Sequence, residues 1–329
     1  MRCGLLLINL GTPKNADIKA VRSYLREFLT DRRVIDLPAA IRYVLVYAFI
    51  LPFRPKKTLK AYQEIWTDEG SPLLSNSLAL VEQLQTRIGD SVKIALGMRY
   101  GAPSIAQALM SLKDCTSITV LPLYPQYSSA ATGSAIEEVL RVAAKLEVIP
   151  SLRILANFYQ HPAYIKAQAE KIKSHLDPQS HLLFTYHGIP ERQLVKSGCE
   201  SVCADICPPI TKKNQDCYKA QCCETSRLIA AELALKPTQF SIAFQSRLGK
   251  TPWTKPYATE MLGALSAKGI KNLTVVCPSF VTDCLETLEE IGIRAKQQWL
   301  DLGGEQFTLV PCLNTDPMWI NALMDIIET

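Results

Sequence analysis

Residues 182–190 read LLFTYHGIP, and residues 5–13 read LLLINLGTP. Each is a short apolar run that ends in Gly-x-Pro, which is typical of a buried strand of a parallel sheet followed by a turn. Two more pairs of phrases recur in the same order: IALGMRYG (94–101) with IAFQSRLG (242–249), and TVLPLYP (119–125) with TVVCPSF (274–280). The repeat predicts an α/β protein of two similar Rossmann-like domains, each with a parallel sheet.

The domain organisation follows from the repeat and from the length. A chain of 329 residues has room for about two domains, and we expect them to span residues 1–160 and 161–329. Two stretches have no counterpart in the other half, namely residues 31–57, which are apolar, and residues 197–223, which are rich in cysteine. Because binding residues concentrate on segments inserted into rigid scaffolds, both stretches are candidates for function.

Composition excludes several classes of protein. Hydrophobic residues make up 48% and charged residues 20%, as in an ordinary folded chain and unlike a disordered one. The net charge of +5 comes without a long basic run, so nothing indicates a nucleic-acid partner. The N-terminus does not read as a signal peptide and no apolar run is long enough to span a bilayer. We therefore expect a cytoplasmic protein.

The apolar insertion allows two interpretations. Residues 34–53 read VIDLPAAIRYVLVYAFILPF, with basic residues on both sides. One interpretation is a buried helix. The other is an amphipathic lip that faces an apolar ligand or the membrane interface, with Arg42, Arg54, Lys56 and Lys57 at the lipid headgroups.

His187 is the histidine best placed for chemistry. It is one of four histidines, and it ends an apolar strand just before Gly188, where a side chain can enter a cleft. A histidine there can act as a base or as a metal ligand. The other three histidines, His161, His175 and His181, lie in helical or turn contexts, and we expect them to be structural.

Two carboxylates follow a strand in the second half. In CPSFVTDCLETLEEI, residues 277–291, Asp283 and Glu286 are three residues apart at the start of a helix, so both lie on one face. The spacing also fits a capping box, which is a purely structural arrangement. Their position after a strand, in the half that also holds His187, favours a role in proton transfer or in binding a divalent ion.

Taken together, these motifs resemble the ferrochelatase family, whose members insert ferrous iron into a porphyrin. The resemblance covers nearly the whole chain. It rests on INLGTP, YQEIWTDEGSPL, MRYG, LYPQYSSAATGS, FTYHGIPER, FQSRLGKTPWTKP, CPSFVTDCLETLEEI and CLNTDPMWI.

The resemblance implies two Rossmann-like domains with an active-site cleft between them, and roles for three residues. His187 and Glu286 would face each other across the metal-insertion site, one accepting a pyrrole proton and the other binding Fe2+, which is a substrate. Asp283 would lie behind Glu286 and relay protons. Cys284 stands where relatives often have a second histidine, which removes one group from any proton path.

The resemblance also implies a set of porphyrin-binding residues. Aromatic side chains can stack on the macrocycle while an arginine holds its carboxylates. Arg54, in the apolar insertion, would meet a propionate. The full set is Leu10, Arg54, Tyr62, Ser71, Arg99, Tyr100 and Trp253.

The cysteine-rich stretch is a candidate for metal binding. Six of the eleven cysteines lie between residues 199 and 223, and four thiolates can bind zinc or an iron–sulfur cluster. The spacing alone matches no common motif and also allows free thiols. Resemblance to those ferrochelatases that carry an internal [2Fe-2S] cluster favours the cluster as a cofactor. We expect its ligands to be Cys199, Cys207, Cys217 and Cys222, with Cys203 and Cys223 as substitutes.

The function implied by the resemblance is insertion of Fe2+ into protoporphyrin IX to form protoheme, the terminal step of heme biosynthesis, at the inner membrane face. One alternative is a chelatase for coproporphyrin or sirohydrochlorin. A further alternative is a noncatalytic heme or iron–sulfur sensor. The sequence indicates no protein partner and no oligomeric state.

Overall fold

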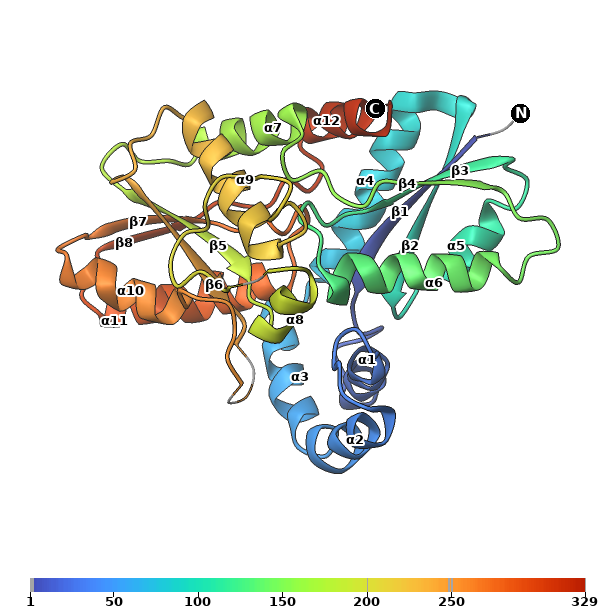
Figure 1. The fold of residues 1–329 in the computed structure, drawn as a ribbon, viewed down its shortest axis with the longest axis horizontal. Coiled ribbons are helices and arrows are strands. Elements are labelled where there is room, and N and C mark those ends of the chain that lie inside the picture. Colours follow the sequence, from blue (N-terminus) through green and yellow to red (C-terminus); the bar gives the residue numbers. More distant parts are fainter. Residues whose placement is uncertain (1–2, 200, 248, 250, 329) are drawn as a thin grey trace. The chain divides into compact units, whose positions relative to one another are not determined.

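The structure is a computed structural model that describes residues 3–199, 201–247, 249 and 251–328 (Figure 1). The chain divides into two compact units. The first unit comprises residues 1–124 and 128–157, and the second comprises residues 125–127 and 158–329. Each unit has its own parallel sheet and its own core.

The first unit contains a four-stranded parallel sheet in the order β2-β1-β3-β4. Its central strand carries the LLLINL run, which is buried on both faces as expected for a parallel sheet covered by helices. The strands are β1 (Cys3–Gly11), β2 (Val92–Tyr100), β3 (Ser117–Pro122) and β4 (Ser151–Ile154).

Helices cover both faces of this first sheet. One face packs against α5 and α6 through side chains such as Leu6, Leu109 and Val139; α4 contacts β1 and β2. The helical elements are α1 (Ile18–Thr30), α2 (Ala39–Val44), η1 (Leu45–Ile50), α3 (Arg54–Ile65), α4 (Pro72–Ile88), η2 (Gly89–Ser91), α5 (Ile105–Ser111), η3 (Ser129–Gly133) and α6 (Ser134–Ala143).

The second unit repeats this plan with a four-stranded parallel sheet in the order β6-β5-β7-β8. The LLFTYH run forms its central strand, and the register places His187 opposite Gln245. The strands are β5 (His181–His187), β6 (Phe240–Gln245), β7 (Asn272–Val276) and β8 (Gln306–Leu309).

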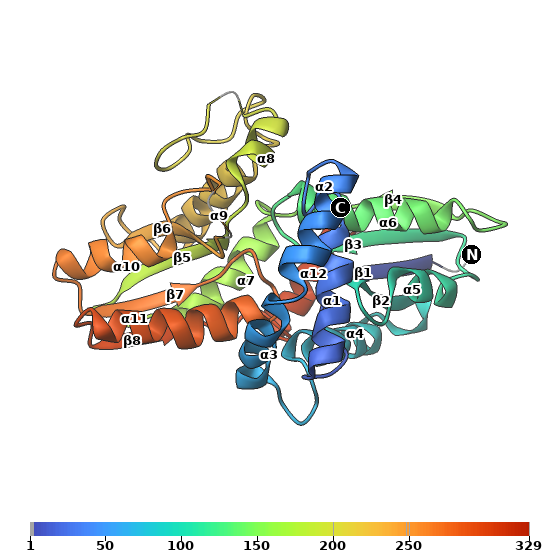
Figure 2. The same ribbon diagram turned by 90° about the horizontal axis from the view of Figure 1, so that it is seen from below.

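In the second unit, α10 and α11 pack on one face of the sheet, where Leu262 and Trp299 meet Leu183. On the other side, α9 contacts β6, and α7 packs against both α9 and α12 (Figure 2). The helical elements are α7 (Pro162–Lys173), α8 (Glu191–Lys196), α9 (Tyr218–Glu232), α10 (Ala258–Ala267), η4 (Glu286–Ala295), α11 (Lys296–Asp301) and α12 (Pro317–Glu328).

The predicted fold is therefore confirmed: the two sheets have the same strand order, and the three repeated phrases form equivalent strands. The fold requires the glycine of LLLINLGTP, which explains why the repeated phrase contains one. Gly11 has φ +108°, and a Cβ there would lie 1.7 Å from the carbonyl oxygen of Tyr100. Only glycine fits a left-handed turn that runs so close to the neighbouring strand.

The apolar insertion is largely exposed, so the buried-helix interpretation is wrong. Residues 39–53 form α2, the π-helix η1 and a turn, with only some side chains, such as Val46 and Leu51, turned inward. Arg42 is 9% exposed and donates to the carbonyl of Leu37, so it does not reach lipid headgroups as expected. No helix within the described residues is long and apolar enough to cross a membrane.

Candidate functional site

His187 lies at the C-terminal end of β5 with its side chain half-buried. Its Nδ1 is 2.6 Å from the carbonyl oxygen of Gly188. A carbonyl can only accept a hydrogen bond, so Nδ1 carries the proton and the Nε2 lone pair is left available. An imidazole held in this tautomer can accept a proton or bind a metal ion through Nε2.

The main chain around His187 is fixed from two sides. The hydroxyl of Tyr218 donates to the His187 carbonyl at 2.8 Å, and the His187 amide donates to Ser279 Oγ at 3.3 Å. A Cβ on Gly188 would lie 2.9 Å from the carbonyl oxygen of Gln245, so the chain needs glycine at this close approach. The imidazole is therefore presented by a rigid strand end.

Asp283 is buried, and its carboxylate accepts three hydrogen bonds. The donors are Asn314 Nδ2 at 2.7 Å, Thr287 Oγ1 at 3.1 Å and the Cys312 amide at 3.3 Å. The capping-box interpretation is wrong, because the Asp283 amide donates to Asn314 Oδ1 and not to Glu286. Asp283 is instead locked in a polar network that it shares with a distant loop.

Glu286 is the first residue of η4, a π-helix, and its side chain is partly exposed. Gln245, which lies opposite His187 in the sheet, donates from Nε2 to the Glu286 carbonyl at 2.9 Å. One side chain thus connects the strand next to His187 with the start of the helix that carries Glu286. The π-helix is a rare form that is frequently found at functional sites.

A second glutamate on the π-helix holds the loop after β6. Ser246 has φ +67°, its amide donates to Glu290 Oε1 at 2.8 Å, and its hydroxyl also donates to the Glu290 carboxylate. Four residues of this region were not predicted from the sequence: Tyr218, Gln245, Glu290 and Asn314. Only their proximity in sequence to the identified motifs could have suggested them.

Three thiols surround the carboxylates. Cys277, Cys284 and Cys312 are all buried. Burial raises the pKa of Cys277 to about 12, and burial together with the nearby Glu286 carboxylate raises the pKa of Cys284. These thiols therefore stay neutral at physiological pH, and Cys284 does not replace a titrating histidine.

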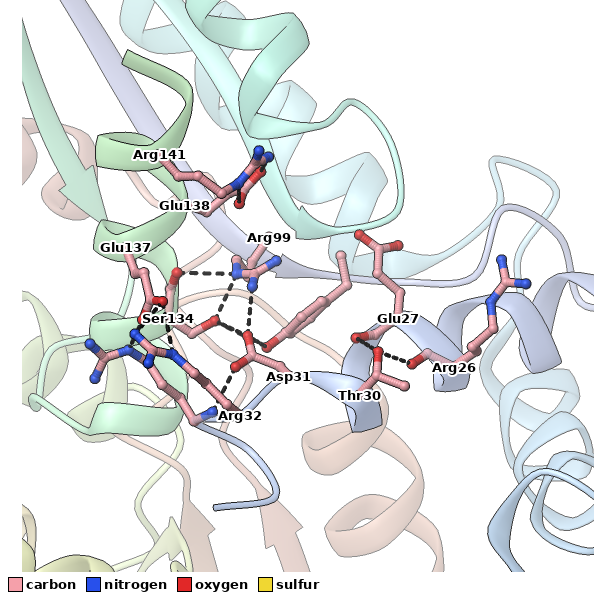
Figure 3. Close-up of polar contacts among 12 residues, drawn as sticks. Arg26, Glu27, Thr30, Asp31, Arg32, Arg99, Ser134, Glu137, Glu138 and Arg141 are labelled. Atoms are coloured by element: carbon pink, nitrogen blue, oxygen red, sulfur yellow. Dashed lines mark hydrogen bonds and ion pairs between the residues drawn. The ribbon is translucent and has the colours of Figure 1, made fainter. Parts of the chain in front are cut away.

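In the first unit, Arg99 belongs to a polar network with Asp31 and Ser134 (Figure 3), and Tyr100 is part of the same network. Arg99 lies 2.6 Å from Asp31 Oδ2 and donates from Nε to Ser134 Oγ at 2.7 Å. Tyr100, which is fully buried, donates to the same Asp31 oxygen at 2.9 Å. Burial raises the pKa of Asp31, but the hydrogen bonds from Ser134 and its neighbours outweigh this effect and lower it. Asp31 thus fixes the position of the Arg99 side chain near the end of β2.

The other residues expected to bind porphyrin in this unit lie on separate elements. Ser71 is buried at the start of α4 and accepts a hydrogen bond from Thr12 at 2.8 Å. Tyr62 is buried between Tyr24 and Trp66. Leu10, near the end of β1, and Arg54, the first residue of α3, are partly exposed.

Trp253 is partly exposed in the second unit, beside the His187 turn. Pro190 and Trp253 form an antiparallel bridge, and the adjacent Thr254 amide donates to the Ile189 carbonyl at 2.9 Å. A Cβ on Gly188 would lie 3.5 Å from the Trp253 ring. The structure therefore brings Trp253 and the turn that follows His187 together.

The cysteine-rich stretch packs against the N-terminus of α9. Hydrogen bonding from Cys207 lowers the pKa of Cys217 to about 6 and that of Cys223 to about 7. Cys199 interacts with Cys217, although burial raises its own pKa to about 11. Cys199, Cys207, Cys217 and Cys223 thus lie close enough to affect one another's pKa.

Cys222 has a different environment from the one expected of a ligand. It is fully buried, and burial raises its pKa, with Cys223 as a further cause. Its neighbours include Tyr218, whose hydroxyl faces His187. Among the described residues, no three His, Cys, Asp or Glu side chains are arranged to hold a single metal ion.

Comparisons with known proteins agree on one family. The family model for Ferrochelatase matches residues 2–329. A ferrochelatase from Legionella pneumophila (strain Philadelphia 1) is 63% identical over 328 residues, which cover 100% of this chain and 99% of that protein. A ferrochelatase from Coxiella burnetii (strain CbuK_Q154) is 51% identical, covering 98% of this chain and 92% of that one.

Solved structures share the fold at low identity. SirB from Bacillus subtilis with Fe3+ has a TM-score of 0.56 and 14% identity, covering 100% of this chain and 95% of that one. The sirohydrochlorin chelatase SirB of subspecies spizizenii, in complex with cobalt, has a TM-score of 0.55 and 13% identity, with coverage of 100% and 94%. At this identity the likeness concerns the fold alone.

Proposed function

This chain belongs to the ferrochelatase family, and we propose that His187, Glu286 and Asp283 carry out its reaction. The enzyme is a metal chelatase that inserts Fe2+ into protoporphyrin to form heme. The alternative of a noncatalytic sensor is wrong, because full-length relatives at high identity are ferrochelatases. The observation that best supports the proposed residues is the fixed tautomer of His187, whose Nε2 is left available.

The reaction needs a base and an anionic group. Insertion removes two pyrrole protons and strips water from Fe2+, so both a proton acceptor and a carboxylate ligand are useful. His187 Nε2 would accept a pyrrole proton, and Glu286, which is partly exposed, would take the incoming ion. Asp283 is buried among donors and would pass protons or hold the helix start in place. Gln245 lies opposite His187 in the sheet and donates to the main-chain carbonyl of Glu286, so it connects the two residues.

For porphyrin binding we propose Leu10, Arg54, Tyr62, Ser71, Arg99 and Trp253. Arg99 already pairs with Asp31, so it would bind a propionate while keeping its contact with that carboxylate. Tyr100 is fully buried and bonded to Asp31, so we assign it a positioning role toward Arg99 and not a direct contact.

The test of the function is an anaerobic assay with purified protein, Fe2+ and a porphyrin. Loss of porphyrin fluorescence and appearance of the heme spectrum are expected with protoporphyrin. Parallel reactions with coproporphyrin and sirohydrochlorin determine the substrate. Faster turnover of either one would move the assignment to another tetrapyrrole.

We further propose a [2Fe-2S] cluster on Cys199, Cys207, Cys217 and Cys223. Each iron of such a cluster takes two protein thiolates, so the four thiols need not surround a single point. Cys207 affects the pKa of Cys223, which supports Cys223 as the fourth ligand in place of Cys222. When bound, the cluster would supply a rigid cross-link beside Tyr218, which holds the carbonyl of His187.

The cluster proposal predicts different results for adjacent cysteines. The variants C217S and C223S should lose the visible absorption of the cluster, because each removes one of four ligands. The variant C222A should retain it, because Cys222 interacts with Tyr218 in the core. Absorption spectra and iron content after anaerobic reconstitution measure the difference. If C222A lost the absorption of the cluster and C223S kept it, the ligands would instead be Cys199, Cys207, Cys217 and Cys222.

We also propose that the apolar insertion, residues 39–53, contacts the surface of the cytoplasmic membrane. Ile41, Val44, Phe49 and Phe53 are 56%, 58%, 63% and 75% exposed. Contiguous exposure of large apolar side chains marks interaction surfaces. Lys56, Lys57 and Lys60 follow on α3 and are exposed, which suits anionic headgroups.

The double variant F49S/F53S should bind vesicles that contain anionic lipid about tenfold more weakly, because it removes two exposed aromatic side chains that would enter the lipid. Co-sedimentation with such vesicles measures the binding. The control V148S/I149S changes side chains that are 81% and 60% exposed elsewhere in the first unit. Equal losses in both variants would contradict a specific membrane surface.

A further inference from the structure

Asn314 lies in a motif to which the proposed function gives no role. The motif CLNTDPMWI, residues 312–320, covers the end of the loop between β8 and α12 and the start of α12. Asn314 is half-buried there and has φ +44°, a left-handed conformation that asparagine adopts more readily than most residues. Nearby, Asp316 accepts from the Met318 amide at 2.9 Å and pairs with Lys171. The loop that carries Asn314 is therefore anchored to the start of α12 and to α7.

Asn314 makes three hydrogen bonds to the segment that follows β7. Its main-chain amide donates to the carbonyl of Val281 at 2.8 Å, and its Oδ1 accepts from the Asp283 amide at 2.9 Å. Its Nδ2 donates to Asp283 Oδ2 at 2.7 Å. One side chain thus binds both the main chain and the carboxylate of Asp283. The site needs an acceptor and a donor together, and asparagine supplies both, whereas an ionised aspartate supplies only acceptors.

The carboxylate of Asp283 depends on this contact. It is 7% exposed, and no cation in the described part of the chain forms an ion pair with it. A buried carboxylate is costly unless hydrogen bonds compensate for the lost water. Thr287 and the Cys312 amide donate to Oδ1, whereas among the described residues Oδ2 receives its hydrogen bond from Asn314 alone. Without the Asn314 side chain, one buried oxygen would lose its donor.

The same contact bears on Glu286. Thr287 donates to Asp283 Oδ1 at 3.1 Å and accepts from the Cys284 amide at 3.0 Å. These bonds close the turn of residues 283–287, which contains Glu286, the first residue of η4. A displacement of Asp283 would therefore move the start of η4. Small displacements of the groups that perform a reaction are enough to slow it.

We propose that Asn314 is a positioning residue for metal insertion: it holds Asp283, and through Asp283 the start of η4, in the conformation that presents Glu286. This role rests on those proposed for Asp283 and Glu286. Because Asn314 acts through another residue, it should affect the rate of metal insertion and not the binding of porphyrin.

Two single variants test this role in the full-length protein, with Fe2+ and protoporphyrin under anaerobic conditions. N314G keeps the left-handed backbone and the donor to Val281 but removes the side-chain amide. N314D replaces the donor to Asp283 Oδ2 with a carboxylate oxygen. Both should lower kcat about 10- to 10²-fold, with the dissociation constant of porphyrin unchanged. The control N321D changes an exposed asparagine of α12 and should keep the wild-type kcat.

The exchanged pair D283N/N314D separates positioning from a general loss of stability. Its new amide can donate to its new carboxylate, while the amide oxygen still accepts from Thr287 and from the Cys312 amide. We expect it to turn over about tenfold faster than either N314D or D283N, because the exchange restores the hydrogen bonds. This comparison with D283N remains possible if N314G and N314D do not fold. Recovery of the wild-type unfolding midpoint without recovery of kcat would overturn the positioning role.

The same measurements separate this role from the proposed catalytic residues. Wild-type kcat in N314G and N314D, together with large losses in D283N and E286Q, would overturn the role of Asn314 alone. Wild-type kcat in D283N and E286Q would overturn the catalytic assignment of both carboxylates, and the role of Asn314 with it.

Discussion

The variant H187A should form heme about 10²- to 10⁴-fold more slowly than wild type, with porphyrin binding close to wild type. The tautomer explains the size of the loss: Nδ1 is bonded to the Gly188 carbonyl, so Nε2 is the free nitrogen of the ring. Removing the imidazole removes that lone pair. Anaerobic initial rates and porphyrin fluorescence titration measure the two quantities.

Two further variants separate chemistry from structure at this position. H187N keeps an N–H donor for the Gly188 carbonyl but has no basic nitrogen, so it should be as inactive as H187A and closer to wild type in stability. H175A changes a histidine that contacts its own helix end at Lys171 and should retain activity. An H187N protein with wild-type rates would show that the lone pair is not needed.

Much of the scaffold around His187 could be predicted from the sequence, because parallel strands buried on both faces leave uninterrupted apolar runs. The repeated phrases LLLINLGTP and LLFTYHGIP identified two equivalent strands. The position of His187 at a strand end followed directly. What the sequence could not give is the hydrogen bond that fixes its tautomer, since that depends on the local path of the chain.

The π-helix and the partners of Asp283 were not predictable for a different reason. The apolar pattern after Asp283 fits an ordinary helix, whereas η4 has the wider π form. Asn314 and Cys312 reach Asp283 from a loop about thirty residues later in the chain. Such long-range polar contacts leave no periodic signal, so spacing alone favoured a capping box that does not form.

The cysteines show a choice that spacing leaves open. Cys222 and Cys223 are adjacent in sequence, and nothing in the spacing says which one faces the other thiols. In the helix the two thiols have different neighbours: Cys207 affects the pKa of Cys223, and Tyr218 affects that of Cys222. The apolar insertion is a similar case, because an apolar pattern predicts burial equally well against a core or against a membrane.

The variant E286Q should reduce heme formation about 10²-fold or more, with little change in stability. The amide has the same shape as the carboxylate, and the contact that fixes this helix start uses the Glu286 main-chain carbonyl, not its side chain. The substitution therefore removes only the carboxylate that would bind Fe2+ or accept a proton. Initial rates over a range of Fe2+ concentrations measure the effect, and E260Q, on an exposed turn of α10, is the control.

A variant of Asp283 serves as the comparison for E286Q, because it should change stability as well as activity. D283N should lower the free energy of unfolding by about 1–3 kcal/mol, because its amide would face donors where three hydrogen bonds are now accepted. A variant that loses activity through disorder should thus show both defects, as we expect for D283N, whereas E286Q should show only the kinetic one. If E286Q were as unstable as D283N, its slower heme formation would be explained by disruption of the start of η4. The metal-binding role would then be assigned to another carboxylate of the π-helix.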